Sequence, residues 1–181
     1  MISNLLFFKL VWLASLLGVA AGYAWLGILT LTLFITWHAA TAPTARADFA
    51  IALTAMLVGV LLDSLYVSSG LIAYKGELIW SDGAPLWILA LWANFALTFN
   101  GCLQWLKERR MLAAGLAMVC GPLSYYGGIR LGTATVTGND IALYALIGLG
   151  WSVAVPLLLW LLSRYEKKLR PEEPVNALLF T

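Results

Sequence analysis

Charged side chains are scarce in this sequence. Its 181 residues include 11 Lys and Arg and 9 Asp and Glu, which together make 11% of the chain, whereas 62% of the residues are hydrophobic. Soluble domains carry about 25% charged residues. The net charge of +2 is too small to indicate a nucleic-acid partner. A composition this poor in charge predicts an integral membrane protein.

Histidine and cysteine are also rare. One His in the whole chain argues against a His-based metal site, and no cluster of residues has metal-ligand spacing. The two cysteines, Cys102 and Cys120, fall on different predicted helices and at different depths, so we expect two small buried thiols and no disulfide. The sequence shows no nucleophile–base pair, paired carboxylates or phosphate loop, and it therefore indicates no catalytic residues and no cofactor.

Long apolar runs divide the chain into membrane-spanning segments. The run from Leu5 to Trp37 carries one charge, Lys9, and exceeds the roughly 20 residues that one crossing needs. Small residues between Gly18 and Gly22 mark a turn within it. Backbone polar groups must be satisfied inside a spanning segment, which predicts helices. We expect an all-α, polytopic membrane helical bundle with six crossings: Leu5–Ala21, Tyr23–His38, Phe49–Tyr66, Leu86–Trp105, Met111–Tyr126 and Ile141–Leu162. Residues 1–163 form this single domain, and residues 164–181 a short cytoplasmic tail.

Basic residues indicate how the bundle is oriented. With both termini in the cytoplasm, the outer segments carry Lys75 and Arg130, beside the acidic Glu77, Asp82 and Asp140. The positive-inside rule therefore predicts an N-in, C-in topology. The cytoplasmic segments then carry Arg46, Lys107, Arg109, Arg110, Arg164, Lys167, Lys168 and Arg170.

Two ionisable residues lie in the outer half of the predicted bundle. A carboxylate such as Asp63 costs a few kcal/mol in hydrocarbon unless it is paired or hydrated, and Arg130 lies at a similar depth. We therefore expect these two residues to pair. Gly121-Pro122 predicts a kink or break in the fifth helix, beside Tyr125 and Tyr126. This group is a candidate binding site for a ligand with an anionic group. The alternative is an interfacial aromatic belt with a snorkelling Arg.

Amides follow the predicted fourth helix. Asn94 lies on one face, and Asn100 and Gln104 share another. Amides between membrane helices usually hydrogen-bond neighbouring helices, so we favour a structural role, with a polar path toward the cytoplasm as the alternative. At the inner surface we expect His38 to be solvated. We also expect Arg46 and Asp48 to form a local pair at a helix start.

Several stretches together are similar to a bacterial inner-membrane family of unknown function, DUF2878: FKLVWLASLLGVAAG, LLDSLYVSSG, APLWILALWANFALTFNGCLQWL and GPLSYYGGIRLG. The resemblance singles out Asp63, Trp87, Asn100, Tyr125 and Arg130. The sequence departs from the family pattern at Lys9, where we expect an uncharged polar residue. Family members resemble the products of gene groups that also include cyclopropane-fatty-acid-synthase-like methyltransferases and flavin oxidoreductases. The resemblance thus implies an inner-membrane location and a link to lipid modification or envelope stress, but no reaction.

Two functions remain open from the sequence. The first is binding or transport of a lipid-like or small amphipathic ligand, with the candidate residues Asp63, Trp87, Asn94, Asn100, Gln104, Tyr125, Tyr126 and Arg130. The second is a non-catalytic accessory or scaffold subunit that docks lipid-modifying enzymes at its basic inner surface. Membrane lipids are the expected partners in either case. An intramembrane enzyme is the least favoured class, because no catalytic set is visible.

The asymmetry of basic residues predicts the outcome of reporter fusions. Alkaline phosphatase fused to the C-terminus should be inactive and green fluorescent protein fused there should fluoresce, because both report a cytoplasmic end. A fusion after Lys75 should give the reverse pattern and serves as the matched control. An active C-terminal phosphatase would contradict the topology.

Overall fold

The computed structural model of the chain describes residues 1–76, 80–81 and 83–169. Glu77, Asp82 and Arg170, which the sequence analysis placed in outer and tail segments, lie outside the described residues. The described residues form six α-helices, one 3-10 helix and two short strands. In chain order these are α1 (Ile2–Ala20), α2 (Trp25–Thr41), α3 (Ala45–Ser68), β1 (Ile72–Tyr74), α4 (Leu86–Ala96), η1 (Gln104–Leu106), α5 (Arg110–Arg130), β2 (Ala134–Val136) and α6 (Asp140–Leu169).

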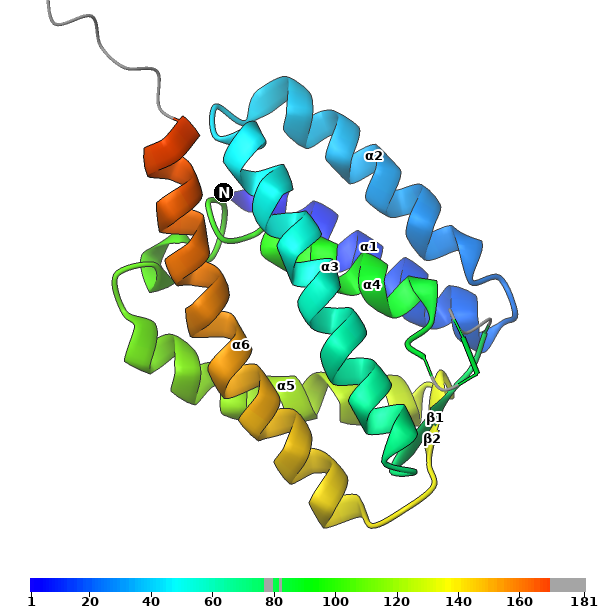
Figure 1. Ribbon diagram of the computed structural model, residues 1–181. Coiled ribbons are helices and arrows are strands. Elements are labelled where there is room, and N and C mark those ends of the chain that lie inside the picture. The colour runs from blue at the N-terminus through cyan, green and yellow to red at the C-terminus, as the bar shows by residue number, and fades with distance from the viewer. Residues whose placement is uncertain (77–79, 82, 170–181) are drawn as a thin grey trace, which may run out of the picture.

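Helix α4 is the central element. It packs against α1, α2 and α3, while α6 packs against α3 and α5 (Figure 1). Buried residues cover every side of α4, including Trp87, Trp92 and Ala96. A helix that is apolar all round is typical of a buried position. The other helices therefore surround α4 and shield it.

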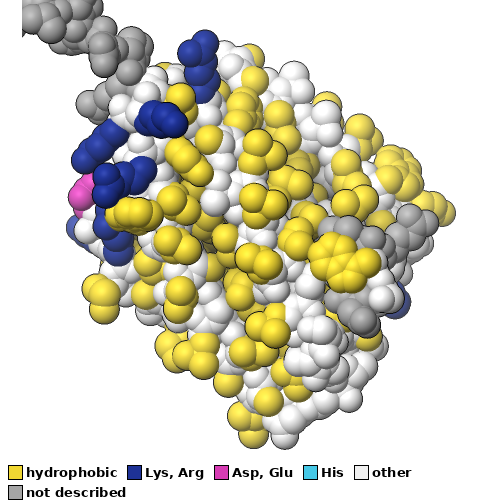
Figure 2. Space-filling model, viewed as in Figure 1, with side chains coloured by type: hydrophobic (Ala, Val, Ile, Leu, Met, Phe, Trp, Pro, Cys, Tyr) yellow, Lys and Arg dark blue, Asp and Glu magenta, His cyan; other side chains and the backbone are white. Residues whose placement is uncertain are grey.

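The surrounding helices carry an apolar outer surface. Four of them, α1, α3, α5 and α6, are long and apolar enough to cross a membrane. Large apolar side chains on them are exposed, among them Leu61 (72%), Leu123 (61%) and Val153 (68%), and hydrophobic side chains cover much of the face in Figure 2. Exposed apolar patches of this extent mark contact with a membrane. The chain is thus an all-α, multi-pass membrane protein.

The two ends of the bundle differ in charge. Met1, Lys107 and Glu166 border one hollow, and exposed Lys and Arg side chains gather around the end of α6 (Figure 2). We call this the basic end. Strands β1 and β2 lie at the opposite end, the strand end (Figure 1). They pair antiparallel, with Ile72 opposite Val136 and Tyr74 opposite Ala134. The sequence analysis missed this pair, because strands of three residues leave no periodic pattern.

Three helices end at a glycine in the left-handed region. Gly22 (φ 86°), Gly70 (φ 69°) and Gly132 (φ 80°) follow α1, α3 and α5. At each end the next residue donates its N–H to a carbonyl five residues earlier, as Tyr23 does to Gly18 (2.6 Å). This motif satisfies carbonyls that lack a helical partner and turns the chain sharply. The expected turn near Gly22 is confirmed.

The fourth helix is shorter than predicted. Its expected range, Leu86–Trp105, is wrong beyond Ala96, because Leu97–Leu103 run in turns and lead into η1. The Thr98 hydroxyl donates to the Phe95 carbonyl (2.5 Å), a local bond that competes with helix formation. The 11 residues of α4 span about 16 Å, roughly half of the hydrocarbon core.

Asn4 of α1 supports the irregular segment after α4. Its Nδ2 donates to the Leu97 carbonyl (3.0 Å), and its Oδ1 accepts the Cys102 N–H (3.2 Å). Non-helical backbone at membrane depth is tolerated where the protein itself satisfies the polar groups. Asn4 therefore allows the chain to leave the helix inside the bundle.

Helix α5 is continuous through its proline. It runs from Arg110 to Arg130 with Pro122 inside, so of the predicted kink or break at Gly121-Pro122 the break is wrong and the kink stays a prediction. Gly148 of α6 packs directly on this point, since a Cβ there would lie 2.9 Å from the Met118 carbonyl oxygen and 3.4 Å from Pro122. Membrane helices tolerate proline where a neighbouring helix covers the carbonyl that it leaves free.

Gly101 offers a test of the Asn4 support. A Cβ at Gly101 would meet the Asn4 side-chain amide, so Gly101→Ala must displace it from Leu97 and Cys102. We expect a loss of about 1–3 kcal/mol of stability, measured as a lower melting temperature in detergent. Gly115→Ala is the matched control, because a Cβ there meets nothing within 4 Å. Equal melting temperatures for the two variants would contradict the assigned role of Asn4.

Candidate functional site

A buried carboxylate organises the strand end of the bundle. Asp63 of α3 is 0% exposed. Its Oδ1 accepts the hydroxyls of Tyr74 (2.5 Å) and Tyr125 (2.7 Å), and its Oδ2 accepts the Trp92 indole N–H (2.8 Å). The donors come from β1, α5 and α4. We call these four residues the Asp63 cluster.

The expected pair between Asp63 and Arg130 is wrong. Arg130 is exposed, and the ion pairs found among the described residues do not include it. Three neutral donors satisfy the carboxylate instead. Such donors stabilise a buried charge because each hydrogen bond to an ionised group is stronger than one between neutral groups.

Two members of the cluster, Tyr74 and Trp92, were not predicted as site residues. Trp92 reaches Asp63 across Gly59, where a Cβ would collide with the indole ring. Burial raises the pKa of Tyr74 well above its ordinary value, and the nearby Asp63 carboxylate raises that pKa further. The phenol therefore stays protonated as a donor. A buried indole or phenol needs an acceptor, and this need was the signal available in the sequence.

Further aromatic rings pack around the cluster. The rings of Trp92 and Trp151 are 4.6 Å apart between centroids, and those of Tyr125 and Trp151 are 6.2 Å apart. Tyr66 lies edge-on to Tyr125 at 6.1 Å. Contacts of this kind add roughly 0.5–1.5 kcal/mol per pair to burial. The cluster is thus held rigidly.

A cavity of about 400 Å³ lies beside the cluster. Residues of α1, α4 and α5 line it, and Tyr74, Trp92 and Tyr125 form part of its wall. Because their polar atoms bind Asp63, these side chains present mainly ring surface to the cavity. Most other lining residues are apolar, among them Leu5, Phe8, Leu16, Leu91, Phe95, Leu116, Ala117, Ile129 and Val155. Ligand sites typically have volumes of about 300–1,000 Å³ and apolar walls. We call this space the apolar cavity.

The other predicted site residues of this part of the bundle form a buried pair, Trp87 and Asn94, and an exposed pair, Tyr126 and Arg130. Trp87 lines the apolar cavity and donates its indole N–H to the Lys75 carbonyl (2.8 Å). Asn94 is buried and donates to the Phe8 carbonyl (3.1 Å), which ties α4 to α1. Tyr126 and Arg130 are exposed and do not line the cavity.

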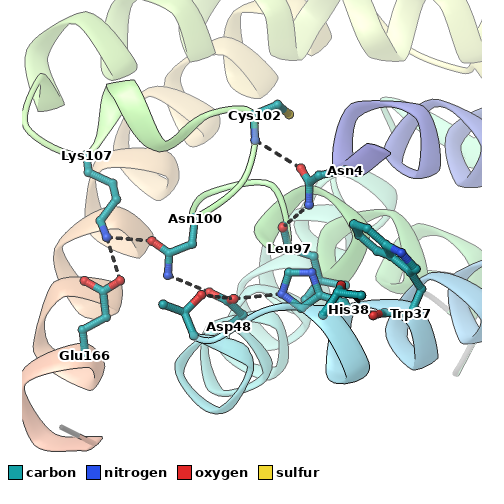
Figure 3. Close-up of polar contacts among 11 residues, drawn as sticks. Asn4, Trp37, His38, Asp48, Leu97, Asn100, Cys102, Lys107 and Glu166 are labelled. Atoms are coloured by element: carbon teal, nitrogen blue, oxygen red, sulfur yellow. Dashed lines mark hydrogen bonds and ion pairs between the residues drawn. The ribbon is translucent and has the colours of Figure 1, made fainter. Parts of the chain in front are cut away.

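Asn100 belongs to a second polar cluster at the basic end (Figure 3). Asp48, 0% exposed, accepts hydrogen bonds from Thr44 (2.7 Å) and Asn100 (2.7 Å) and pairs with His38 Nε2 (2.8 Å). The side-chain amide oxygen of Asn100 in turn accepts a hydrogen bond from Lys107 Nζ (2.6 Å). We call these five residues the Asp48 network.

The Asp48 network corrects three expectations. Asp48 is buried with His38 and does not pair with Arg46, which is exposed. His38 is 4% exposed, not solvated. Asn100 and Gln104 lie beyond the end of α4, not on one helix face. Lys107 also pairs with Glu166 of α6 (2.6 Å), so the network links four parts of the chain.

A hollow of about 680 Å³ adjoins the network, and Gln104 lines it. Among the residues that the structure describes, no group of three or more His, Cys, Asp or Glu could hold a metal ion. Both cysteines are free thiols, and Cys120, expected to be buried, is exposed on the wall of the apolar cavity.

The chain is similar to a protein family of unknown function. A family model described as "Protein of unknown function (DUF2878)" matches residues 1–157. No curated protein and no solved structure matches the chain.

The Asp63 cluster predicts an order of stability among variants. Asp63→Leu leaves three buried donors without an acceptor, so we expect it to lose about 3 kcal/mol or more. Asp63→Asn keeps an oxygen that can accept from both tyrosines, but its NH₂ group then faces the Trp92 N–H, and both are donors. This variant should therefore lose less stability than Asp63→Leu. Glu108→Gln, at an exposed acid, controls for loss of charge. Thermal unfolding in detergent measures the order. Equal melting of the two Asp63 variants would contradict the assigned hydrogen bonds.

Proposed function

The chain belongs to the DUF2878 family of proteins of unknown function, and we propose that it is a lipid-binding protein of the bacterial inner membrane. Its ligand is lipid-like, and one hydrocarbon chain of that ligand occupies the apolar cavity. The observation that carries the proposal is the cavity itself. It has the volume and the apolar wall of a ligand site, and it lies in a protein whose outer surface is apolar.

The rim of the apolar cavity supports entry from the bilayer. Leu5, Leu116 and Cys120 line it and are also exposed on the surface of the bundle. These residues belong to α1 and α5, with the buried α4 between them as the floor. A hydrocarbon chain can therefore pass from lipid into the cavity sideways, without crossing water.

The proposed topology has six crossings with both termini in the cytoplasm. Helix α4 and the segment from Leu97 to Leu106 together form the fourth crossing, from the strand end to the basic end. Exposed arginines and lysines at the basic end support its cytoplasmic placement. Discontinuous helices of this kind often accompany binding sites in membrane proteins.

The alternative proposal is an accessory subunit for lipid-modifying enzymes. It draws its support from the exposed basic residues around α5 and α6, which include Arg109, Arg110 and Lys167. A lipid-binding cavity is compatible with such a role, since the subunit would then present lipid to the enzyme. We favour binding as the basic property, because the cavity supports it directly.

Filling the cavity tests the proposed function. Cys120→Trp places a large ring on the cavity wall, and we expect the amount of lipid-like ligand that copurifies to fall at least tenfold, an order-of-magnitude estimate from lost apolar burial. Val119→Trp is the matched control, because Val119 is exposed on the same helix but does not line the cavity. Native mass spectrometry of both variants gives the bound fraction. Equal ligand in both would reject the cavity as the binding site.

A further inference from the structure

Among the described residues, one charged side chain lines the apolar cavity. Lys9 of α1 stands among lining residues that are otherwise apolar or neutral. Its Nζ lies 5.6 Å from the centroid of the Phe8 ring and 5.8 Å from that of Trp12, and both rings line the same cavity. The ammonium group therefore sits at the cavity wall, held by cation–π contacts.

Lys9 has no acidic partner among the ion pairs found in the described residues. Asp63, which Tyr74, Trp92 and Tyr125 of the cavity wall bind, does not offset it, because Asp63 is fully buried and three donors occupy its carboxylate oxygens. Lys9 is exposed on α1, a helix long and apolar enough to cross a membrane, and an unpaired cation on such a helix is unfavourable next to lipid. An anion in the cavity would offset part of such a cost.

The position of Lys9 also indicates which part of a ligand it would meet. On α1 the cavity extends from Leu5 to Leu16, about 17 Å along the helix axis. Lys9 lies toward the basic end of this stretch, and Leu16 lies toward the strand end. An acidic group at Lys9 would thus direct its chain along α4 toward the Asp63 cluster.

The dimensions favour a single chain. From Lys9 to Leu16 the cavity runs about 10 Å along α1, less than the roughly 15 Å of one leaflet. A volume of about 400 Å³ is in the lower part of the range for ligand sites. A lipid with two chains would leave one of them outside the cavity.

We propose that the ligand is a free fatty acid, with its carboxylate paired to Lys9 and its hydrocarbon chain in the apolar cavity. This inference rests on the proposed function and adds the substrate class. Binding energy comes from burial of the chain, and the preference for an acid comes from the Lys9 ammonium.

Three single-chain probes of equal length test the proposal: palmitate, hexadecanol and hexadecylamine. Their affinities for the purified full-length protein in a non-ionic detergent can be read from tryptophan fluorescence, since Trp12, Trp87, Trp92 and Trp151 line the cavity. We expect palmitate to bind about tenfold more tightly than hexadecanol, and hexadecylamine to bind most weakly. A factor of ten is the size expected for one charge-assisted hydrogen bond at a partly exposed site.

Variants of Lys9 assign the effect to one residue. Lys9→Gln should lower palmitate affinity about tenfold while changing hexadecanol affinity much less, and Lys9→Arg should keep the preference for the acid. Lys168→Gln removes the same charge from an exposed site outside the cavity and controls for general attraction of anions. Binding of hexadecanol also shows that the Lys9→Gln variant is folded.

The outcomes separate this inference from the proposed function. If palmitate and hexadecanol bind equally, or if Lys9→Gln and Lys168→Gln behave alike, the fatty-acid assignment is overturned and the lipid-binding cavity stands. The assignment also fails if phosphatidylglycerol, a two-chain anionic lipid, competes more strongly than palmitate. If no probe binds more weakly to Cys120→Trp than to the native chain, the cavity and the fatty acid are rejected together.

Discussion

The carboxylate of Asp63 must find its hydrogen-bond donors inside the protein, because the surrounding lipid offers none. Tyr74, Trp92 and Tyr125 supply them from β1, α4 and α5, while Asp63 itself belongs to α3. Four elements thus meet at one charge: β1 follows α3 directly, whereas Trp92 and Tyr125 lie 29 and 62 residues beyond Asp63. Three of these elements, β1, α4 and α5, also line the apolar cavity, so the position of the cavity follows from the way this charge is satisfied.

The same constraint governs the basic end. Helix α4 stops at Ala96, and Asn4 binds the Leu97 carbonyl and the Cys102 N–H of the backbone that follows. Asn100 lies beyond the end of the helix, so its side chain can donate a hydrogen bond to Asp48 and accept one from Lys107. Lys107 in turn pairs with Glu166, which extends the network to α6. A second buried carboxylate therefore holds the irregular half of the fourth crossing in place. The bundle has one such anchor at each end of α4.

Apolar runs and glycines predicted the positions of the helices well, as the turn at Gly22 shows, because both signals act locally. The end of α4 could not be predicted in this way, since Leu97, Phe99 and Leu103 continue the apolar run beyond Ala96. The partners of Asp63 were missed for another reason. Pairing it with Arg130 assumed that a charge seeks an opposite charge, whereas Tyr74 and Trp92 are neutral donors whose approach depends on tertiary packing. Tyr125 binds Asp63 whereas its neighbour Tyr126 is exposed, because successive helix residues point about 100° apart.

The aromatic donors of the Asp63 cluster also explain how a site rich in polar atoms can present an apolar wall. Each hydroxyl or indole N–H is turned toward Asp63, so the cavity meets the rings and not their polar atoms. A wall held by charge-assisted bonds is already ordered before a ligand enters, which lowers the entropic cost of binding. Affinity then depends on the apolar area that the ligand buries, at about 25 cal/mol per Å². Because that term does not distinguish one hydrocarbon chain from another, the proposed preference for an acidic head group depends on the charge at the cavity wall, Lys9.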